Sequence, residues 1–329
     1  MLSGLLIEMT GERIDIVGTD LELTVKASAA VQGEGTGSTV LPARLFSDIV
    51  RSLEPGVVEV EVDDDEARIS AGRSEFTVRV MPAADFPRPK PAGEEGIPID
   101  GQVFSEALRQ VVPTASRDDA RPILTGVLLA SEGQGMRLVA TDSYRLAVRD
   151  LPSQHLFEAD QQVLIPARAL GELQRVLGQD PVKLSLSDRD ASFEVGSTRI
   201  TTRLIEGQFP NYRQLLPQGY PNRLTAQREP LIEAVRRVRL VTQGRENTPV
   251  RISMRADGVE LDVDAHEVGH AHEALDAKFE GTEMVVAFNP EFLVDGLQAI
   301  TGPEVVIETL DPLKPVTARS VEDGGFTYL

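Results

Sequence analysis

The chain has 329 residues, of which 41% are apolar, and a formal net charge of −19. It contains no cysteine, which excludes a disulfide framework and thiolate metal sites. The first residues meet acidic side chains too early for a signal peptide, and no long apolar run follows. We therefore expect a soluble cytoplasmic protein of two or three domains without membrane contact. The acidic total argues against nucleic-acid binding unless basic residues gather locally.

In chain order, the first pattern is strand, turn, strand, turn, strand in "GLLIEMTGERIDIVGTDLELTVKA". A helix pattern, "PARLFSDIVRSL", follows it, and then the strand candidates "VVEVEV", "ARISAG" and "FTVRVM". The same order returns twice, with the helices "PARALGELQRVL" and "NPEFLVDGLQAI". Pro42, Pro166 and Pro290 begin the three helix patterns, and 166 minus 42 equals 290 minus 166, or 124 residues. The sequence therefore predicts three copies of one unit.

The second and third copies carry a further helix pattern before their strands, "SEALRQV" and "IEAVRRV". Each full copy then has two helices and a mainly antiparallel sheet, which is an α+β arrangement able to bury its own core. We expect the domains 1–92, 93–217 and 218–329.

The first copy has no residues for its leading strand and helix, and the third stops soon after "FTYL" begins. We expect a chain truncated at both ends, with domain I incomplete at its N-terminal side and domain III at its C-terminal side. A variant first domain that never had the helix is the alternative.

The stretch "HEVGH" from His266 to His270 has the H-E-x-x-H pattern of zinc hydrolases, and His272 follows. That chemistry needs a helix, on which residues i and i+4 share one face and can hold the metal. The preceding "VELDVDA" alternates like a strand, and the same slots in the other copies are turn and strand. We predict an exposed hairpin strand with His270 and His272 on one face, no metal site and no catalysis.

Arginines recur on the helix patterns. Arg44 and Arg51 stand two and nine residues after the first proline, and Arg168 and Arg175 hold the same offsets in the second copy. Residues seven apart lie on one helix face. The third copy has Phe292 and Ala299 there, and its other helix compensates with Arg228, Arg236, Arg237 and Arg239. Locally basic helices in an acidic chain suit contact with phosphates, and without tryptophan or an aromatic platform we expect no sequence readout.

The stretches "LVATDSYRLAVRDLP", "RDDARPILTG", "MPAADFP" and "EGQFPNYRQLLP" carry a resemblance that spans all three repeats. The chain resembles the bacterial DNA polymerase III beta subunit, the replicative sliding clamp. This family implies the DNA clamp fold, with helices on the concave face and sheets outside. It further implies a head-to-tail homodimer that encircles double-stranded DNA without sequence specificity and acts as a processivity factor in DNA replication. Neither catalysis nor a cofactor is implied. A zinc hydrolase using His266, Glu267 and His270 is the alternative function.

The resemblance also implies partners and sites. The partners are the clamp loader, the replicative DNA polymerase, other DNA polymerases and repair factors, which dock by short linear motifs. Their pocket is assigned to Leu124, Thr141, Ser143, Tyr144, Arg145, Leu146, Pro210, Gln214, Leu215, Val316 and Leu329. The residues facing DNA are Arg44, Arg51, Arg117, Arg121, Arg168, Arg175, Arg236 and Arg237. The dimer interface is assigned to Gly72, Arg73, Phe76, Val78, Val241 and Thr242. The family often has glycine-histidine at Ser143-Tyr144 and arginine at Gln214.

Overall fold

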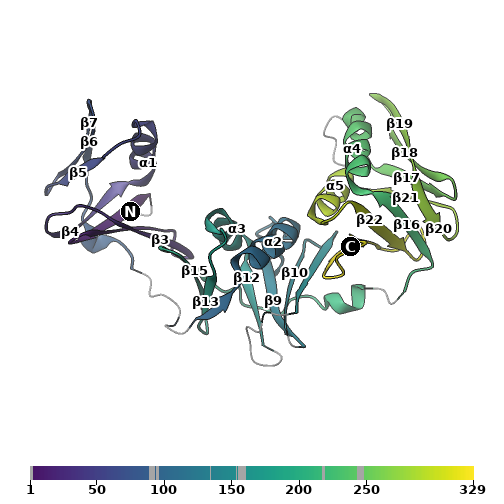
Figure 1. Cartoon of the computed structure of the whole chain (residues 1–329), viewed down its shortest axis with the longest axis horizontal. Helices are drawn as coiled ribbons and strands as arrows, with labels where there is room; N and C mark the ends of the chain where they lie inside the picture. Colours follow the sequence, from purple (N-terminus) through teal and green to yellow (C-terminus); the bar gives the residue numbers. More distant parts are fainter. Residues whose placement is uncertain are drawn as a thin grey trace. The chain divides into compact units, whose positions relative to one another are not determined.

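The computed structural model describes residues 3–88, 93, 96–133, 135–152, 154, 161–216, 219–242 and 248–329. The chain forms two compact units, each built from two segments (Figure 1). Unit 1 comprises Met1–Gln102 and Gly171–Leu204, and unit 2 comprises Val103–Leu170 and Ile205–Leu329. Among the described residues, no helix has the length and apolar character needed to span a membrane.

The larger sheet of unit 1 is antiparallel, with the strand order β4-β1-β2-β3-β15-β14-β13-β8. Its strands are β1 (Gly4–Thr10), β2 (Arg13–Thr19), β3 (Leu23–Ala30), β4 (Thr36–Pro42), β8 (Ile97–Ile99), β13 (Val182–Leu186), β14 (Asp190–Val195) and β15 (Thr198–Arg203). Strand β3 of the first repeat pairs with β15 of the second, with Val25 opposite Ile200. One sheet therefore serves two repeats, where the sequence suggested a separate core for each. The backbone groups at the edge of β3 form hydrogen bonds with those at the edge of β15, so neither edge stays unpaired.

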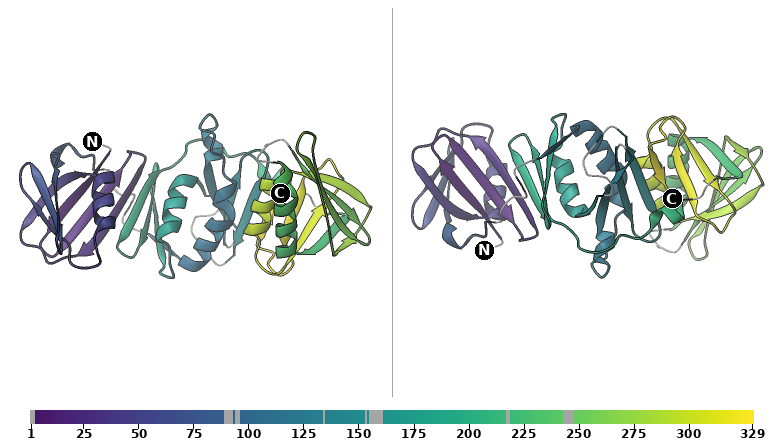
Figure 2. Two further views of the ribbon diagram at one scale, coloured as in Figure 1. Left: turned by 90° about the horizontal axis from the view of Figure 1, so that it is seen from above. Right: turned by 90° about the horizontal axis from the view of Figure 1, so that it is seen from below.

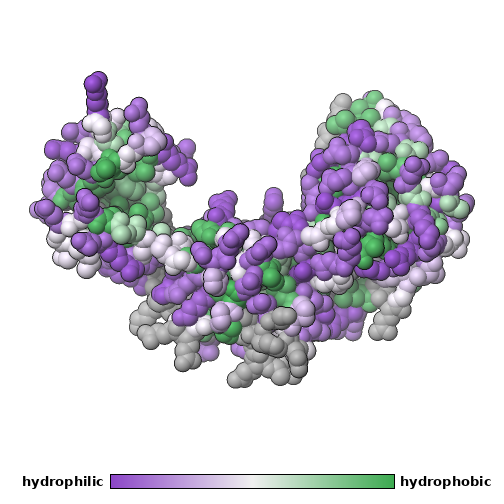
Figure 3. All heavy atoms as spheres, in the orientation of Figure 1, coloured by the Kyte–Doolittle hydropathy of each residue, from purple (hydrophilic) through white to green (hydrophobic). Residues whose placement is uncertain are grey.

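A second sheet in unit 1 contains β5 (Glu59–Val62), β6 (Glu66–Ala71) and β7 (Ser74–Arg79). Helix α1 (Ala43–Ser52) covers it, since Ile49 packs with Ile69 and Val78. The outer side of this group stays apolar. Leu45 is 48% exposed, whereas its counterparts Ala169 and Leu293 are 1% and 7% exposed. The valines of β5 are exposed as well, and Figure 3 shows apolar surface on unit 1.

Unit 2 contains a nine-stranded sheet with the order β12-β9-β10-β11-β24-β23-β22-β16-β20. Its strands are β9 (Gly126–Glu132), β10 (Gly135–Thr141), β11 (Leu146–Leu151), β12 (Gln162–Pro166), β16 (Asn222–Gln227), β20 (Ala277–Glu280), β22 (Glu304–Thr309), β23 (Val316–Ser320) and β24 (Phe326–Tyr328). Strand β11 of the second repeat pairs with β24 of the third, with Ala147 opposite Tyr328. This is the same junction as β3 with β15, one repeat further along the chain.

The other sheet of unit 2 has the order β19-β18-β17-β21, with β17 (Val250–Arg255), β18 (Gly258–Ala265), β19 (Gly269–Leu275) and β21 (Met284–Phe288). The remaining helices are α2 (Gly101–Val111), α3 (Ala167–Val176), α4 (Arg228–Val238) and α5 (Pro290–Ala299). The 3-10 helices are η1 (Ala83–Asp85), η2 (Val112–Thr114), η3 (Pro122–Thr125), η4 (Tyr212–Leu215) and η5 (Arg239–Thr242). Helices α4 and α5 lie side by side in unit 2 (Figure 2).

The predicted repeat pattern is confirmed element by element, but two of its prolines lie elsewhere than expected. Pro42 and Pro166 end strands β4 and β12, opposite Gly4 and Gly126, and the helix starts one residue later. Only Pro290 occupies the first turn of its helix, after the cap Asn289. Pairing of β4 with β1 and of β12 with β9 keeps the first two prolines in the strands. A residue that lacks a backbone N–H is tolerated both at the end of a strand and at the start of a helix.

Two helix glycines in the described residues give a direct test of packing. A Cβ on Gly296 of α5 would overlap the ring of Tyr328, whereas a Cβ on Gly171 of α3 would meet nothing within 4 Å. We expect Gly296→Ala to destabilise the protein by about 1–3 kcal/mol because the ring must shift. Gly171→Ala should instead stabilise it by about 0.5–1 kcal/mol through helix propensity. Urea unfolding of both variants measures this; equal effects of the two alanines would contradict it.

Candidate functional site

A large pocket in unit 2 has a volume of about 1360 Å³. Its walls come from segments far apart in the sequence. They include Leu124, the β10–β11 turn, η5, the chain from Val286 to Leu293, the segment Pro312–Val316, and Tyr328 with Leu329. The pairing of β11 with β24 brings the last two segments beside the turn, because Leu146 and Leu329 exchange backbone hydrogen bonds of 2.9 and 2.8 Å. The pocket is therefore a product of the junction between two repeats.

The structure brings together nearly all of the predicted pocket residues. Those that line the pocket are Leu124, Thr141, Ser143, Tyr144, Arg145, Leu146, Pro210, Leu215, Val316 and Leu329. Gln214 is the exception: it lies on η4 beside Leu215, is exposed, and is not part of the pocket wall. The binding role of all eleven residues stays a prediction.

The apolar residues of the pocket divide into a floor and a rim. Leu146 is only 1% exposed and belongs to a core cluster with Val148 and Tyr212, so it supports the floor from below. At the rim, large apolar side chains stay in contact with water: Tyr144 is 78%, Leu240 73% and Leu313 93% exposed. Exposed apolar groups around a concave surface are typical of a binding site.

The β10–β11 turn is shaped by two side chains. Asp142 Oδ1 accepts from the backbone N–H groups of Tyr144 and Arg145, and Thr141 Oγ1 accepts from that of Ser143. Ser143 has φ of 80°, in the left-handed region that favours glycine. The resembling family often has glycine at this position, and the positive φ gives the reason. Here the Ser143 hydroxyl accepts instead from Arg121 at 3.1 Å.

The first repeat builds the same turn from the same letters. Asp20 accepts from the backbone of Glu22 and Leu23, Thr19 accepts from Leu21, and Leu21 also has φ of 80°. The Thr-Asp pair therefore determines the turn in two repeats. The third repeat lacks the pair.

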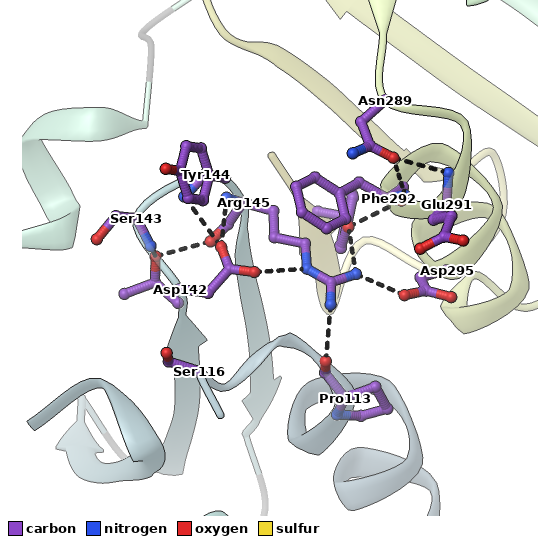
Figure 4. Close-up of polar contacts among 12 residues, drawn as sticks. Pro113, Ser116, Asp142, Ser143, Tyr144, Arg145, Asn289, Glu291, Phe292 and Asp295 are labelled. Carbon is purple, nitrogen blue, oxygen red and sulfur yellow. Dashed lines mark hydrogen bonds and ion pairs between the residues drawn. The ribbon is translucent and has the colours of Figure 1, made fainter. Parts of the chain in front are cut away.

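Arg145 connects the two sides of the pocket (Figure 4). Its guanidinium donates to Asp142 at 3.0 Å, to Asp295 of α5 at 2.6 Å and to the carbonyl oxygen of Pro113 at 3.0 Å. It also lies over the ring of Phe292, 4.4 Å from the ring centre. The side chain is 11% exposed. Segments from two repeats thus meet at one cation.

The charges around Arg145 compensate one another. Burial opposes the cation, but Tyr328, Asp295 and Asp142 together raise the pKa of Arg145 above its usual value. Burial raises the pKa of Tyr328 to about 12, against the opposing effect of the Arg145 charge. The Tyr328 hydroxyl therefore keeps its proton at neutral pH and donates to the carbonyl oxygen of Phe292 at 2.9 Å. The geometry provides a binding surface with a fixed cation.

The arginines predicted to face DNA are all on helices or on the loop before η3. Arg44 and Arg51 lie exposed on α1, Arg168 and Arg175 on α3, Arg117 and Arg121 before η3, and Arg236 and Arg237 on α4. Several have carboxylate partners: Asp118 for Arg121, Glu172 for Arg175, Glu233 for Arg236 and Glu273 for Arg237. Among the described residues, no ion pair involves Arg44, Arg51 or Arg117.

Two further arginines of the third repeat have other positions. Arg228 donates to the backbone carbonyls of Ile300 and Gly302, so it ties α4 to the end of α5. Arg239 lines the pocket. Neither compensates for the arginines missing from α5, which corrects that part of the expectation.

The residues assigned to a dimer interface differ in their exposure: some are exposed and others are buried. Gly72 and Arg73 are exposed in the β6–β7 turn, and Phe76 is partly buried. Val78 is 5% exposed because it packs in the core with Ile49 and Ile69. Its side chain therefore offers little surface to a partner, but β7 is an edge strand of its sheet, and its interface role stays a prediction.

Val241 is partly buried on η5, whereas Thr242 is 6% exposed and lines the pocket. Thr242 therefore has little exposed surface. The interface role of all six assigned residues stays a prediction.

The histidines lie where the repeat alignment predicts. His266 is in the turn after β18, and His270 and His272 are exposed on β19. A strand cannot give the i, i+4 geometry of a zinc hydrolase. His270 and His272 share a face, since both approach Asp262, at 3.7 and 2.9 Å. Within the described part of the chain, no cluster of three ligating side chains is placed to hold a metal.

Sequence reasoning missed several pocket residues, above all Phe292, Leu240 and Leu313. A signal existed for Phe292, because it occupies the slot of Arg44 and Arg168 in the other repeats. An aromatic residue at a position that is otherwise basic indicates a different use of that helix face. Leu240 lies on the short 3-10 helix η5 and Leu313 in a turn, and no periodicity reveals where such short segments lie in space.

Comparisons with known families match nearly the whole chain. The model for the N-terminal domain of the DNA polymerase III beta subunit matches residues 1–90, that for its central domain residues 98–211, and that for its C-terminal domain residues 213–329. The Beta sliding clamp of Streptomyces coelicolor is 34% identical over 322 residues, which cover 96% of this chain and 85% of that protein.

Solved structures agree with the sequence comparison. The beta subunit of DNA polymerase III from Thermotoga maritima matches with a TM-score of 0.90 and 27% identity, over 99% of this chain and 90% of that one. A sliding clamp from Pseudomonas aeruginosa bound to griselimycin matches with a TM-score of 0.91 and 26% identity, over 99% and 90% of the two chains.

The histidine face of β19 gives a test that depends on pH. The hydrogen bond with Asp262 raises the pKa of His272 above its ordinary value. A raised pKa in the folded state means that protonation favours folding at low pH and that this contribution is lost as the pH rises through the folded pKa. We expect Asp262→Asn to lower the pKa of His272, measured by NMR titration. Asp264→Asn, opposite His270, is the control; a His272 titration unaffected by Asp262→Asn would contradict the assignment.

Proposed function

The chain belongs to the DNA polymerase III beta subunit family, and on that premise we propose that it is a DNA sliding clamp. It encircles double-stranded DNA, binds without reading sequence, and holds the replicative polymerase at its template as a processivity factor. The observation that carries the proposal is the succession of three family models along three repeats of one fold. Bacterial relatives named as beta sliding clamps support it.

The arginines of the helices are proposed to face the DNA. Arg44 and Arg51 on α1 are exposed and have no carboxylate partner among the described residues, so their charge is available to phosphates. Arg168 and Arg175 repeat their offsets on α3. A lining that contacts only phosphates gives weak binding that falls steeply with salt. An overall charge of −19 is compatible with this proposal. Acidic residues on the outer surface of a ring repel DNA, whereas the arginines of the helices attract its phosphates into the channel.

The pocket of unit 2 is proposed as the docking site for short linear motifs. Such motifs insert one or two large apolar side chains into a concave surface, and the exposed rim of Tyr144, Leu240 and Leu313 suits this mode. The partners are the clamp loader, the replicative polymerase, other DNA polymerases and repair factors.

The ring is proposed to be a head-to-tail homodimer of chains with the domains 1–92, 93–217 and 218–329. The ranges of the three family models support this division, although residues 92, 217 and 218 lie outside those that the structure describes. Gly72, Arg73, Phe76 and Val78 contribute one side of the contact and Val241 and Thr242 the other. The clamp acts in the cytoplasm and catalyses no reaction. No observation favours the alternative zinc hydrolase, since His266 and His270 lie on a turn and a strand.

Retention on DNA tests the ring. After loading by a clamp loader with ATP, the labelled protein should remain on circular plasmid through a high-salt wash, because a closed ring cannot leave a circle. It should be lost when the plasmid is cut once. Gel filtration with circular and linear plasmid measures this. Equal retention on both forms would make the protein an ordinary DNA binder.

The same assay tests the arginines. Replacing Arg44, Arg51, Arg168 and Arg175 with alanine should reduce loading and its salt dependence more than residence on circles. A control replaces the exposed strand and turn arginines Arg189, Arg203, Arg223 and Arg255, which removes the same charge. A control that loads as poorly as the helix variant would show that only total charge matters.

The rim of the pocket provides the test of partner docking. We expect Leu240→Ser with Leu313→Ser to weaken binding of a peptide with leucine and phenylalanine anchors by about 2 kcal/mol or more. Folding should be unaffected, because both side chains are mostly exposed. Fluorescence anisotropy of the labelled peptide measures the affinity. Val57→Ser, at an 81% exposed valine in unit 1, is the control; a control that loses as much affinity would refute the pocket.

Leu146 is unsuited to this test. Leu146→Ala should cost about 2–5 kcal/mol of folding free energy because the side chain fills the core. Lost peptide binding in that variant would not separate contact from unfolding.

A further inference from the structure

The two sides of the pocket are joined through the guanidinium of Arg145. On one side stands the β10–β11 turn, which carries Tyr144, and on the other stands α5, which carries Phe292. The two rings are 6.3 Å apart. Figure 4 shows Arg145 between them, directed at Asp295. The distance between the rings therefore depends on what holds the guanidinium.

The hydrogen-bonding groups of Arg145 are directed at this chain and leave little for a ligand. Nε donates to Asp142, Nη1 to Asp295 and to the Tyr328 hydroxyl at 3.4 Å, and Nη2 to Pro113. Only 11% of the Arg145 side chain is exposed. A peptide carboxylate would have to displace an aspartate that is already in place.

Asp295 is the partner that reaches from the third repeat. It lies one turn beyond Phe292 on α5, is not part of the pocket wall and is 43% exposed. Its carboxylate accepts from Arg145 at 2.6 Å, which is short for a charged pair. Asp295 is therefore connected to the pocket wall through its bond to Arg145.

We propose that Asp295 is a positioning residue of the partner pocket: by holding Arg145, it sets the separation of Tyr144 and Phe292 that receives an apolar anchor. The proposal rests on the docking function of the pocket and adds to it a residue outside the wall. Without the carboxylate, Arg145 keeps Asp142, which is on its own turn, and loses its charged partner on α5. The turn and the helix then keep the contact of the guanidinium with the Phe292 ring but lose the ion pair between them.

The test uses a fluorescein-labelled pentapeptide with leucine and phenylalanine anchors and one aspartate. We expect Asp295→Asn to weaken its binding about tenfold, as for a coupled site, and Asp295→Glu to restore most of the affinity. Asp264→Asn removes a carboxylate from β18, outside the pocket wall, and should leave binding unchanged. Thermal unfolding of each variant at the same pH checks that the fold is retained.

A spectroscopic signature separates positioning from general destabilisation. The chain has four tyrosines, so fluorotyrosine labelling gives four resonances, which Tyr→Phe variants assign. Asp295→Asn should shift the resonances of Tyr144 and Tyr328 in the free protein and leave that of Tyr220 in place.

Each outcome has a defined meaning. If the unaltered chain does not bind the peptide, the docking function fails. If it binds and Asp295→Asn binds equally well, or if Asp295→Glu rescues nothing, the positioning role is overturned. A peptide with asparagine in place of its aspartate should lose the same factor on Asp295→Asn. If that loss disappears, Arg145 binds the peptide acid directly and the proposal is wrong.

Discussion

The pairing of β11 with β24 is the interaction on which the functional part of this protein depends. Strands of the second and third repeats join there, so Leu146 bonds to Leu329 and Tyr328 lies beneath Gly296 of α5. An antiparallel strand cannot leave a buried edge without hydrogen-bond partners, and here the partner comes from the next repeat. The pocket forms where that shared sheet meets the helix, which is why its walls come from distant segments.

At this junction the guanidinium of Arg145 is satisfied within the chain. Arg145 finds Asp142 on its own turn, Asp295 on α5 and a carbonyl oxygen at Pro113. A nearly buried cation without such partners would be costly, so the network is a condition for burying the guanidinium. The rim of the pocket, by contrast, exposes the large apolar side chains of Tyr144, Leu240 and Leu313 to water. The site is thus prepared for hydrophobic burial rather than for charge recognition.

The three repeats share one backbone fold but use its helices for different functions. The position two residues after each of the three equally spaced prolines holds Arg44 on α1, Arg168 on α3 and Phe292 on α5. In the first two it presents a cation on an exposed helix face, and in the third it forms the pocket wall beneath Arg145. Repetition keeps the backbone while single substitutions assign phosphate contact or partner docking to a given helix.

The sequence by itself determined the elements and the turn chemistry. The 124-residue spacing places each helix, and the Thr-Asp pair at Thr141 dictates a local turn whose hydrogen bonds span only four residues. Strand alternation before His266 also excluded a zinc helix, since that choice rests on local period alone. Tertiary structure alone decided which strand edges pair, β3 with β15 and β11 with β24. It also joined Asp295 to Arg145 across 150 residues, because such contacts depend on packing that no local pattern encodes.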